Sequence, residues 1–168
     1  MYVFTVNSIE NKDNSTPANR GQARFYVGIQ FFILFLLIFF SNNVGYQLSI
    51  LRSIGTIFEI VGLLGFLLSA NILRGSLTAI PIPKPDGKLS TNGLYKYVRH
   101  PMYTSVLLLT VGIALRSGSL IKYFLVIALA LLFYFKSIYE ERYLFQKYPE
   151  YGQYLESVPR FIPFTKSR

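Results

Sequence analysis

Two groups of charged residues stand beside apolar runs, and their side chains are of types that bind ligands or move protons. The first is Arg99, His100 and Pro101, which includes the only histidine of the chain, and the second is the pair Glu140 and Glu141. Arginine and histidine donate hydrogen bonds to carboxylates or phosphates, whereas glutamates accept them from an ammonium group. If the two groups meet, they suit a zwitterionic ligand that carries both an ammonium and a carboxylate.

The same residues also have an ordinary structural interpretation. Proline is well placed in the first turn of a helix, where its missing N–H group would have no intrahelical partner. Arginine, lysine and tyrosine are common anchors at a membrane interface. One of the glutamates could simply pair with Arg99 or Arg142, and a surface pair of that kind contributes only about 0–1 kcal/mol.

Composition excludes several kinds of chemistry. The chain has no cysteine, so disulfides, thiol catalysis and cysteine-based metal sites are excluded, and with a single histidine we expect no metal site. The net charge of +9 would suit nucleic acid, but 52% of the residues are hydrophobic and the run from Phe25 to Phe40 carries no charge. We therefore expect an integral membrane protein whose main partner is the lipid bilayer, with no nucleic-acid partner.

The apolar runs predict an all-α integral membrane bundle of about four transmembrane helices, followed by a C-terminal amphipathic helical segment. A membrane-spanning helix needs roughly 20 apolar residues. The third and fourth predicted spans are joined by the short segment Arg116 to Ser119, so they must form an antiparallel hairpin. The predicted spans are residues 24–46, 54–73, 101–116 and 119–139.

The remaining segments are polar. Residues 1–23 form a mixed polar tail, and the composition of Ser41 to Gly45 predicts a turn. Residues 24–168 form one membrane domain, within which prolines 81, 83 and 85 keep the loop before the third span out of helix. Residues 140–168 are polar but helix-prone, and an apolar stripe broken at Pro149 suits a helix that lies on the membrane or folds back over the bundle.

Charge predicts the orientation of the spans. With four spans, both tails and the loop before the third span share one side of the membrane. That side holds all of the 17 Lys and Arg residues except Arg52, Arg116 and Lys122. By the positive-inside rule both termini are expected in the cytosol.

The motif residues of the C-terminal half, in their order, resemble the isoprenylcysteine carboxyl methyltransferase and phospholipid methyltransferase superfamily. The family pattern has G-x-Y, R-H-P-x-Y, a helical hairpin, a Glu pair, Y-x-x-Y and a V-P-R-x-I-P ending. The resemblance covers about residues 89–164. The matching residues are Gly93, Tyr95, Arg99, His100, Pro101, Tyr103, Glu140, Glu141, Leu144, Tyr151, Tyr154, Val158, Pro159, Arg160, Ile162 and Pro163.

The resemblance implies an S-adenosylmethionine-dependent membrane methyltransferase that releases S-adenosylhomocysteine. Its acceptor would be a lipophilic or prenylated molecule entering from the bilayer, either an isoprenylcysteine-type carboxylate or a lipid amine. Arg99, Glu140 and Glu141 are the implied catalytic residues, with one glutamate holding the methionine ammonium and Arg99 near its carboxylate or the substrate. The implied cofactor-binding residues are Tyr95, Val98, Arg99, His100, Pro101, Tyr103, Glu140 and Glu141.

Two other functions stay open. Membrane sterol reductases resemble this C-terminal architecture and use a nicotinamide cofactor, but they are longer and have more spans. A non-enzymatic membrane protein would use the charged groups only as anchors. Binding of S-adenosylmethionine or of NADPH separates these possibilities.

Glu59 lies within the second predicted span and is a candidate functional residue, because carboxylates inside a membrane are costly. The simpler alternative, which we favour, is a proton-bearing carboxyl group hydrogen-bonded to a neighbouring helix. Gly62 and Gly65 follow on the same span, and small residues of this kind let another helix approach closely.

Overall fold

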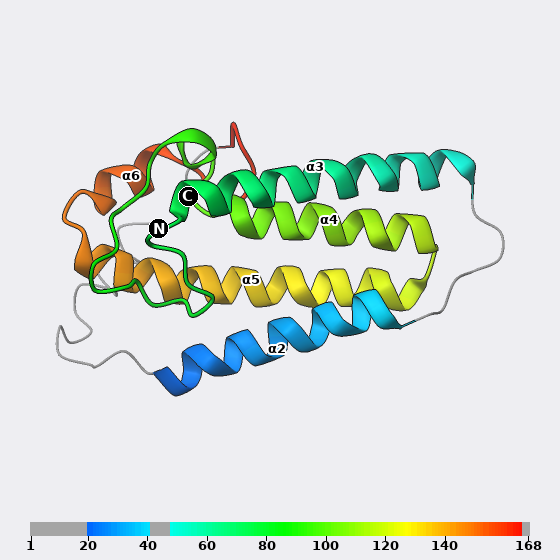
Figure 1. Ribbon diagram of the computed structural model, residues 1–168, viewed down its shortest axis with the longest axis horizontal. Helices are drawn as coiled ribbons and strands as arrows, with labels where there is room; N and C mark the ends of the chain where they lie inside the picture. The colour runs from blue at the N-terminus through cyan, green and yellow to red at the C-terminus, as the bar shows by residue number, and fades with distance from the viewer. Residues whose placement is uncertain (1–19, 41–47, 166–168) are drawn as a thin grey trace.

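The structure, a computed structural model, describes residues 20–40 and 48–165. In this part of the chain it is all-helical, as predicted, with five α-helices, one short 3₁₀ helix and no strand (Figure 1). The elements are α2 (Arg20–Phe39), α3 (Ser49–Leu73), η1 (Gly93–Lys96), α4 (Pro101–Ser117), α5 (Leu120–Lys147) and α6 (Tyr151–Ser157).

Three of the helices, α2, α3 and α5, are long and apolar enough to cross a membrane. The predicted number of four is not confirmed by length, because α4 has 17 residues and reaches only about 26 Å at 1.5 Å per residue. That falls short of the roughly 30 Å of a hydrocarbon core. Helix α2 begins at Arg20, inside the predicted tail, and the rest of that tail and the turn expected at Ser41 to Gly45 lie outside the described residues.

Helix α5 runs further than the predicted span, which ended at residue 139. Its 28 residues make it about 42 Å long, so its C-terminal turns extend beyond a bilayer core. The sequence offers no glycine or proline to stop it before Pro149, and Tyr148 takes the extended conformation that a following proline favours. Glu140 and Glu141 are therefore carried on a rigid helix.

Glycine residues let α3 and α4 pack backbone to backbone. A Cβ atom added to Gly62 would lie 2.6 Å from the backbone nitrogen of Leu109, and one added to Gly112 would lie 2.5 Å from the carbonyl oxygen of Gly55. A Cβ atom on Gly65 would lie 2.6 Å from Ser105 Oγ. The close approach expected at Gly62 and Gly65 is confirmed, and it holds α4 in place although α4 is short.

The second helix pair is α2 and α5, which lie side by side (Figure 1). Ile33 and Leu37 of α2 pack against Leu129 and Phe133 of α5, and all four are buried. Side chains of α4 also pack against this cluster. At the far end of the bundle Gly118, with φ of 64°, makes the left-handed turn that reverses the chain between α4 and α5.

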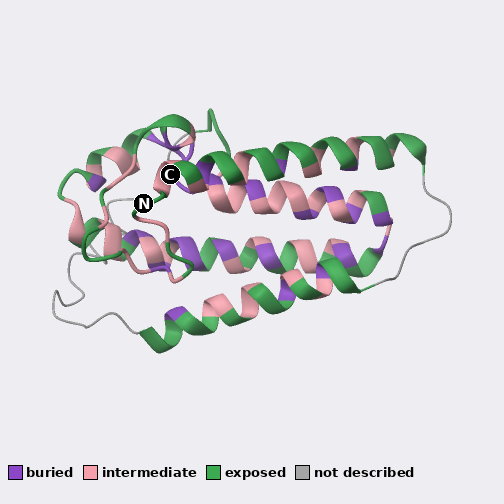
Figure 2. Ribbon diagram, viewed as in Figure 1, coloured by how far each residue is buried: buried purple, intermediate pink, exposed green. Residues whose placement is uncertain are grey.

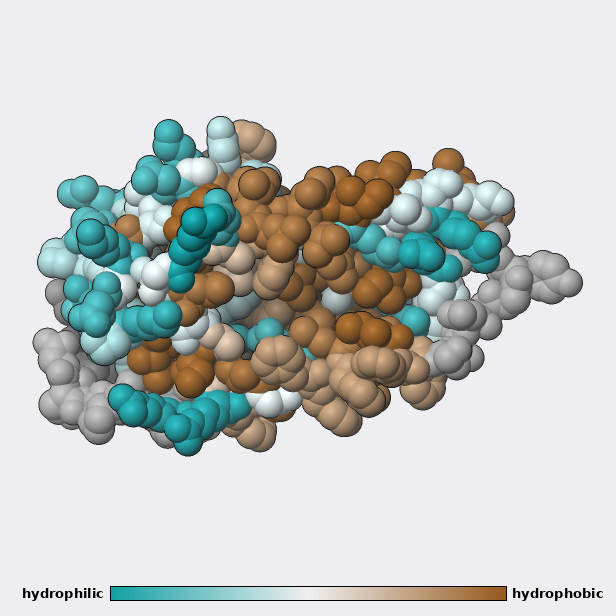
Figure 3. All heavy atoms as spheres, viewed as in Figure 1, coloured by the Kyte–Doolittle hydropathy of each residue, from teal (hydrophilic) through white to brown (hydrophobic). Residues whose placement is uncertain are grey.

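The outer faces of α2 and α3 are exposed along most of their length (Figure 2). Large apolar side chains dominate them, for example Phe31 and Phe35 on α2 and Ile57 and Leu64 on α3. In Figure 3 hydrophobic residues form a band across the middle, while hydrophilic ones gather at the end that carries α6 and, in a smaller group, at the opposite end. An apolar band of this size suits contact with lipid. We call the end with η1, α6 and the loop 74–92 the site end.

Candidate active site

Glu141 is the centre of a buried ionic cluster at the site end. Its Oε1 atom accepts hydrogen bonds from Arg99 Nε at 3.0 Å and Arg160 Nε at 3.1 Å, and lies 3.0 Å from His100 Nε2. Its Oε2 atom accepts one from Arg160 Nη2 at 2.6 Å. Both carboxylate oxygens are thus occupied by side chains of the protein itself, and the Glu141 side chain is only 7% exposed.

The C-terminal segment after α6 holds the Arg-His-Pro sequence in place. The backbone N–H of Arg99 donates to the carbonyl of Pro159 at 2.9 Å, and that of His100 donates to Arg160 at 3.1 Å. The Arg99 guanidinium also donates through Nη1 to the carbonyl groups of Leu155 and Val158. The segment therefore folds back over the bundle, which is one of the two arrangements expected for it.

Glu140 has different surroundings from its neighbour. Its Oε2 atom accepts a hydrogen bond from the Tyr103 hydroxyl at 2.7 Å and lies 3.7 Å from His100 Nδ1. The Glu140 side chain is 27% exposed. The His100 ring stacks on Tyr103, with 5.2 Å between ring centroids. Glu140 therefore keeps capacity for a further hydrogen-bond donor, which Glu141 does not.

Tyr95 and Val98 lie on the other side of Arg99. Both are buried, and the carbonyl of Tyr95 accepts a hydrogen bond from the Tyr154 hydroxyl at 2.6 Å. Burial raises the pKa of Tyr95 and of Tyr154 well above the ordinary value for tyrosine, so both hydroxyls stay protonated. Pro101 is the first residue of α4, as expected from its type, and it too is buried.

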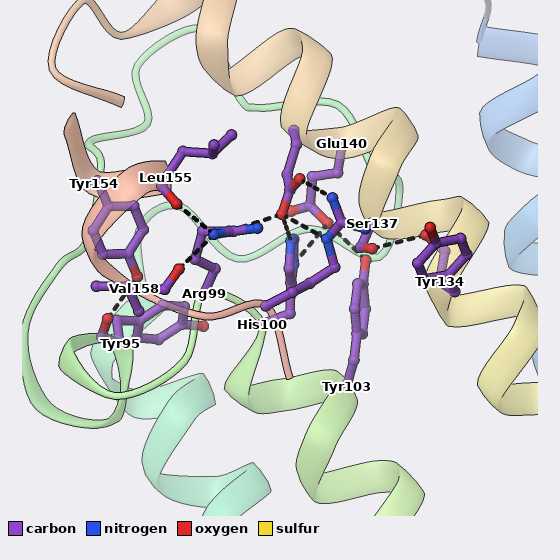
Figure 4. A network of polar contacts seen from close by, with 12 residues as sticks. Tyr95, Arg99, His100, Tyr103, Tyr134, Ser137, Glu140, Tyr154, Leu155 and Val158 are labelled. Carbon is purple, nitrogen blue, oxygen red and sulfur yellow. Dashed lines mark hydrogen bonds and ion pairs between the residues drawn. The ribbon is translucent and has the colours of Figure 1, made fainter. Parts of the chain in front are cut away.

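The structure brings Arg99, His100, Tyr103, Glu140 and Glu141 into one network of polar contacts. Figure 4 labels the first four of these residues. The two charged groups lie some forty residues apart in sequence and meet because α4 and α5 form a hairpin. Tyr95 joins this network only indirectly, through Tyr154 on α6. Val98 and Pro101 contribute no side-chain polar group.

Two buried polar atoms of the site have no hydrogen-bond partner within residues 20–40 and 48–165. They are Arg99 Nη2 and the Tyr151 hydroxyl. Burial raises the pKa of Tyr151, so its hydroxyl is neutral and can donate. Buried donors without partners are rare in folded proteins and commonly indicate a missing ligand or water. Two donors of this kind fit the carboxylate of an amino-acid group.

The comparison with known protein families gives one match, to the model described as phospholipid methyltransferase, over residues 51–151. The chain belongs to the phospholipid methyltransferase family. Together with the three long apolar helices, this makes it an integral membrane protein of a methyltransferase family. The match favours neither the reductase nor the non-enzymatic alternative.

One curated relative of this family member is the cobalt-zinc-cadmium resistance protein CzcN of Cupriavidus metallidurans. The two are 32% identical over 81 residues, which is 48% of this chain. The aligned region is 38% of the relative's length, so the chain spans well under half of that protein. Within the described residues no group of three or more His, Cys, Asp or Glu side chains could hold a metal ion.

A further polar residue beside the site of this methyltransferase family member, Lys136, was not predicted. Lys136 is 2% exposed, and its ammonium donates to Gln30 Oε1 at 2.6 Å and to the carbonyl of Ala79 at 3.2 Å. It also lies 5.2 Å from the centroid of the Tyr103 ring. The signal in the sequence was a lysine inside an apolar span, one helical turn before Glu140.

Glu59 lies outside the site. Its Oε2 atom accepts a hydrogen bond from Arg116 Nη1 of α4 at 2.7 Å. The contact to a neighbouring helix agrees with the structural alternative, but the partner is a cation, so the interaction is an ion pair between α3 and α4.

Proposed function

We propose that the protein transfers a methyl group from S-adenosylmethionine to a lipophilic acceptor at the cytosolic face of the membrane. The observation that carries the proposal is the convergence of Arg99, His100, Tyr103 and Glu140, with unpartnered donors beside them. This donor set matches the ammonium and carboxylate of a methionine group, and the family match supports methyl transfer.

The roles of the two glutamates follow from their partners. Glu140 is the better candidate to bind the methionine ammonium, because its carboxylate is partly exposed and has only the Tyr103 hydroxyl within normal hydrogen-bond distance. Glu141 is already saturated by Arg99, Arg160 and His100, so its role is to position them. Arg99 Nη2 and the Tyr151 hydroxyl would bind the carboxylate.

The adenosyl part would lie against the remaining motif residues. His100 and Tyr103 form a stacked aromatic pair, which offers a flat surface for a base. Tyr95, Val98 and Pro101 are buried beside Arg99 and would complete the lining. Tyrosine rings also attract a cation such as a sulfonium group.

Bound S-adenosylmethionine would supply an electrophilic methyl group to an oxygen or nitrogen atom of the acceptor, with the neutral thioether of S-adenosylhomocysteine as the leaving group. The protein mainly aligns the acceptor with the donor, which is catalysis by proximity and orientation. A carboxylate acceptor needs no base. An amine acceptor must lose a proton, and Glu140 is the candidate to accept it.

Binding of the donor tests this proposal directly. The purified full chain is titrated with S-adenosylmethionine and, separately, with NADPH by calorimetry in detergent. We expect S-adenosylmethionine to bind and NADPH not to bind. Glu140→Gln should weaken donor binding by at least about ten-fold, as expected for a lost charged hydrogen bond.

Glu150→Gln is the matched control. Glu150 is exposed, and its substitution removes the same negative charge near the site end. It should leave donor affinity unchanged. Binding of NADPH in place of S-adenosylmethionine, or full donor affinity in Glu140→Gln, would overturn the assignment.

A further inference from the structure

Lys136 is a buried cation whose partners are all neutral. Its ammonium contacts an amide oxygen, a backbone carbonyl and an aromatic ring. Within the described part of the chain no carboxylate lies within ion-pair distance of it. Arg99, His100 and Glu141, which are buried at the same end of the bundle, all pair with groups of opposite charge.

A neutral side chain could link the same elements at lower cost. Burying an ammonium group without a carboxylate in direct contact is unfavourable, and lysines within membrane helices commonly mark substrate or ion sites. A glutamine at this position could also donate hydrogen bonds to an amide and a carbonyl oxygen. The positive charge therefore needs an explanation beyond tying α2 and the loop 74–92 to α5.

The position of Lys136 relative to Glu140 suggests why a positive charge is present. The two residues are four apart on α5, so they lie on one face of the helix and about 6 Å apart along its axis. Tyr103 connects them, with its hydroxyl bonded to Glu140 and its ring facing the ammonium. Lys136 is thus one turn deeper in the membrane than the carboxylate that we assign to the methyl donor.

Helix α2, which carries no motif residue, lies next to Lys136. Gln30 of α2 reaches Lys136, and α2 lies against α5 (Figure 1), while large apolar side chains are exposed on its outer face. A lipid that enters the bundle beside α2 therefore meets the Lys136 ammonium next to the methyl donor. The amide oxygen of Gln30 is a neutral acceptor, which an anionic oxygen can replace on the ammonium at a gain in charge attraction.

We propose that Lys136 binds an anionic oxygen of the acceptor lipid, a carboxylate or a phosphate, and so selects acceptors that carry a negative charge next to the methylated atom. The proposal rests on the proposed function and limits its acceptors to lipids with an anionic group. Neutral acceptors such as sterols or alcohols lack the group that Lys136 binds. Isoprenylcysteine carboxylates and aminophospholipids both carry it.

Equilibrium binding of three single-chain probes tests the proposal on the full chain in detergent with S-adenosylhomocysteine present. The probes are N-acetyl-S-farnesylcysteine, its neutral carboxamide and lysophosphatidylethanolamine. We expect the carboxylate or the phosphate probe to bind at least about ten-fold more tightly than the carboxamide. Whichever anionic probe shows this preference identifies the source of the anionic oxygen.

Three variants separate anion binding from a structural role. Lys136→Gln should lose the preference and bind the carboxamide as before, Lys136→Arg should retain it, and Lys96→Gln is the control for charge because Lys96 is exposed at the site end. Gln30→Glu adds a carboxylate beside Lys136 and should reduce binding of the anionic probes without lowering the melting temperature.

A preference for neither anionic probe in the unchanged protein, or a preference that survives in Lys136→Gln, would overturn the proposal. Equal weakening of all three probes in both Lys136→Gln and Gln30→Glu would also overturn it, because that result indicates a structural role. Donor titration of the same samples keeps the two proposals separate. Absent donor binding refutes the methyltransferase function, whereas intact donor binding without an anion preference refutes only the role of Lys136.

Discussion

Glu141 Oε1 lies 3.0 Å from Arg99 Nε, across 42 residues of sequence, and both side chains are almost completely buried. Removal of one member of a buried charge pair costs about 3–5 kcal/mol, because the other charge is left without compensation. We therefore expect Glu141→Gln to lower the free energy of unfolding by about that amount, measured by chemical denaturation in detergent. Glu140→Gln should lower it far less, and equal losses in the two variants would contradict the different roles assigned to them.

Tyr103→Phe removes a single hydroxyl group from the site. The ring can keep its stacking on His100 and Phe133, whereas the 2.7 Å hydrogen bond to Glu140 is lost. A hydrogen bond to a charged group contributes about 1.5–3 kcal/mol, and here it holds the Glu140 carboxylate in place, so a less well positioned Glu140 should bind S-adenosylmethionine more weakly. Calorimetric titration measures this, with Tyr97→Phe as the control at an exposed tyrosine.

The contact of α3 with α4 predicts opposite effects for the same substitution at two glycines. Gly62→Ala places a methyl group 2.6 Å from the backbone of α4, so it should destabilise the protein by about 1–3 kcal/mol. Gly28→Ala in α2 meets no atom within 4 Å and should be neutral or stabilising, because alanine favours a helix over glycine by about 0.5–1 kcal/mol. The melting temperatures of the two variants, measured under the same conditions, test this difference in stability.

Glu59→Gln distinguishes a structural from a functional role for that carboxylate. The ion pair with Arg116 is half exposed on the arginine side, so its loss should lower stability by about 1 kcal/mol or less. Donor affinity and methyl transfer should be unchanged, since no described contact links Glu59 to the site end. A fall in methyl transfer at unchanged stability would instead make Glu59 part of the acceptor path.

The orientation of the bundle can be measured cleanly because the chain has no cysteine. Lys96→Cys places a thiol in exposed η1 at the site end, and Leu120→Cys places one on an exposed residue at the opposite end. If the site end faces the cytosol, a membrane-impermeant maleimide should label only Leu120→Cys in intact cells. Labelling of Lys96→Cys alone would reverse the orientation.

Much of the fold follows from apolar runs and chain direction. A turn as short as Arg116 to Ser119 forces α4 and α5 into a hairpin, and this alone brings His100 to the level of Glu141. The fourth span was predicted to end at residue 139, because the sequence turns polar at Glu140, and the helix-prone residues that follow continue the same helix to Lys147. A change to polar residues indicates where a helix leaves the membrane. The end of α5 itself is set by Pro149, which disfavours a helical conformation at Tyr148.

The sequence could not rank Glu140 against Glu141. Adjacent helical residues differ in direction by about 100°, and only the rotation of α5 against α4 decides which carboxylate meets Arg99. The contact between Gln30 and Lys136 was equally hidden, because it joins residues 106 positions apart through the packing of α2 on α5. The spacing of apolar residues along a sequence does not predict a contact between two such distant residues.

The backbone bonds from Arg99 and His100 to Pro159 and Arg160 also set the order in which the protein matures during translation. Helices α2, α3, α4 and α5 emerge from the ribosome before residues 159 and 160 are made, so their insertion into the bilayer can precede completion of the candidate site. A nascent chain halted in between would be inserted without a complete candidate site. The candidate site can therefore form only after residues 159 and 160 have been synthesised.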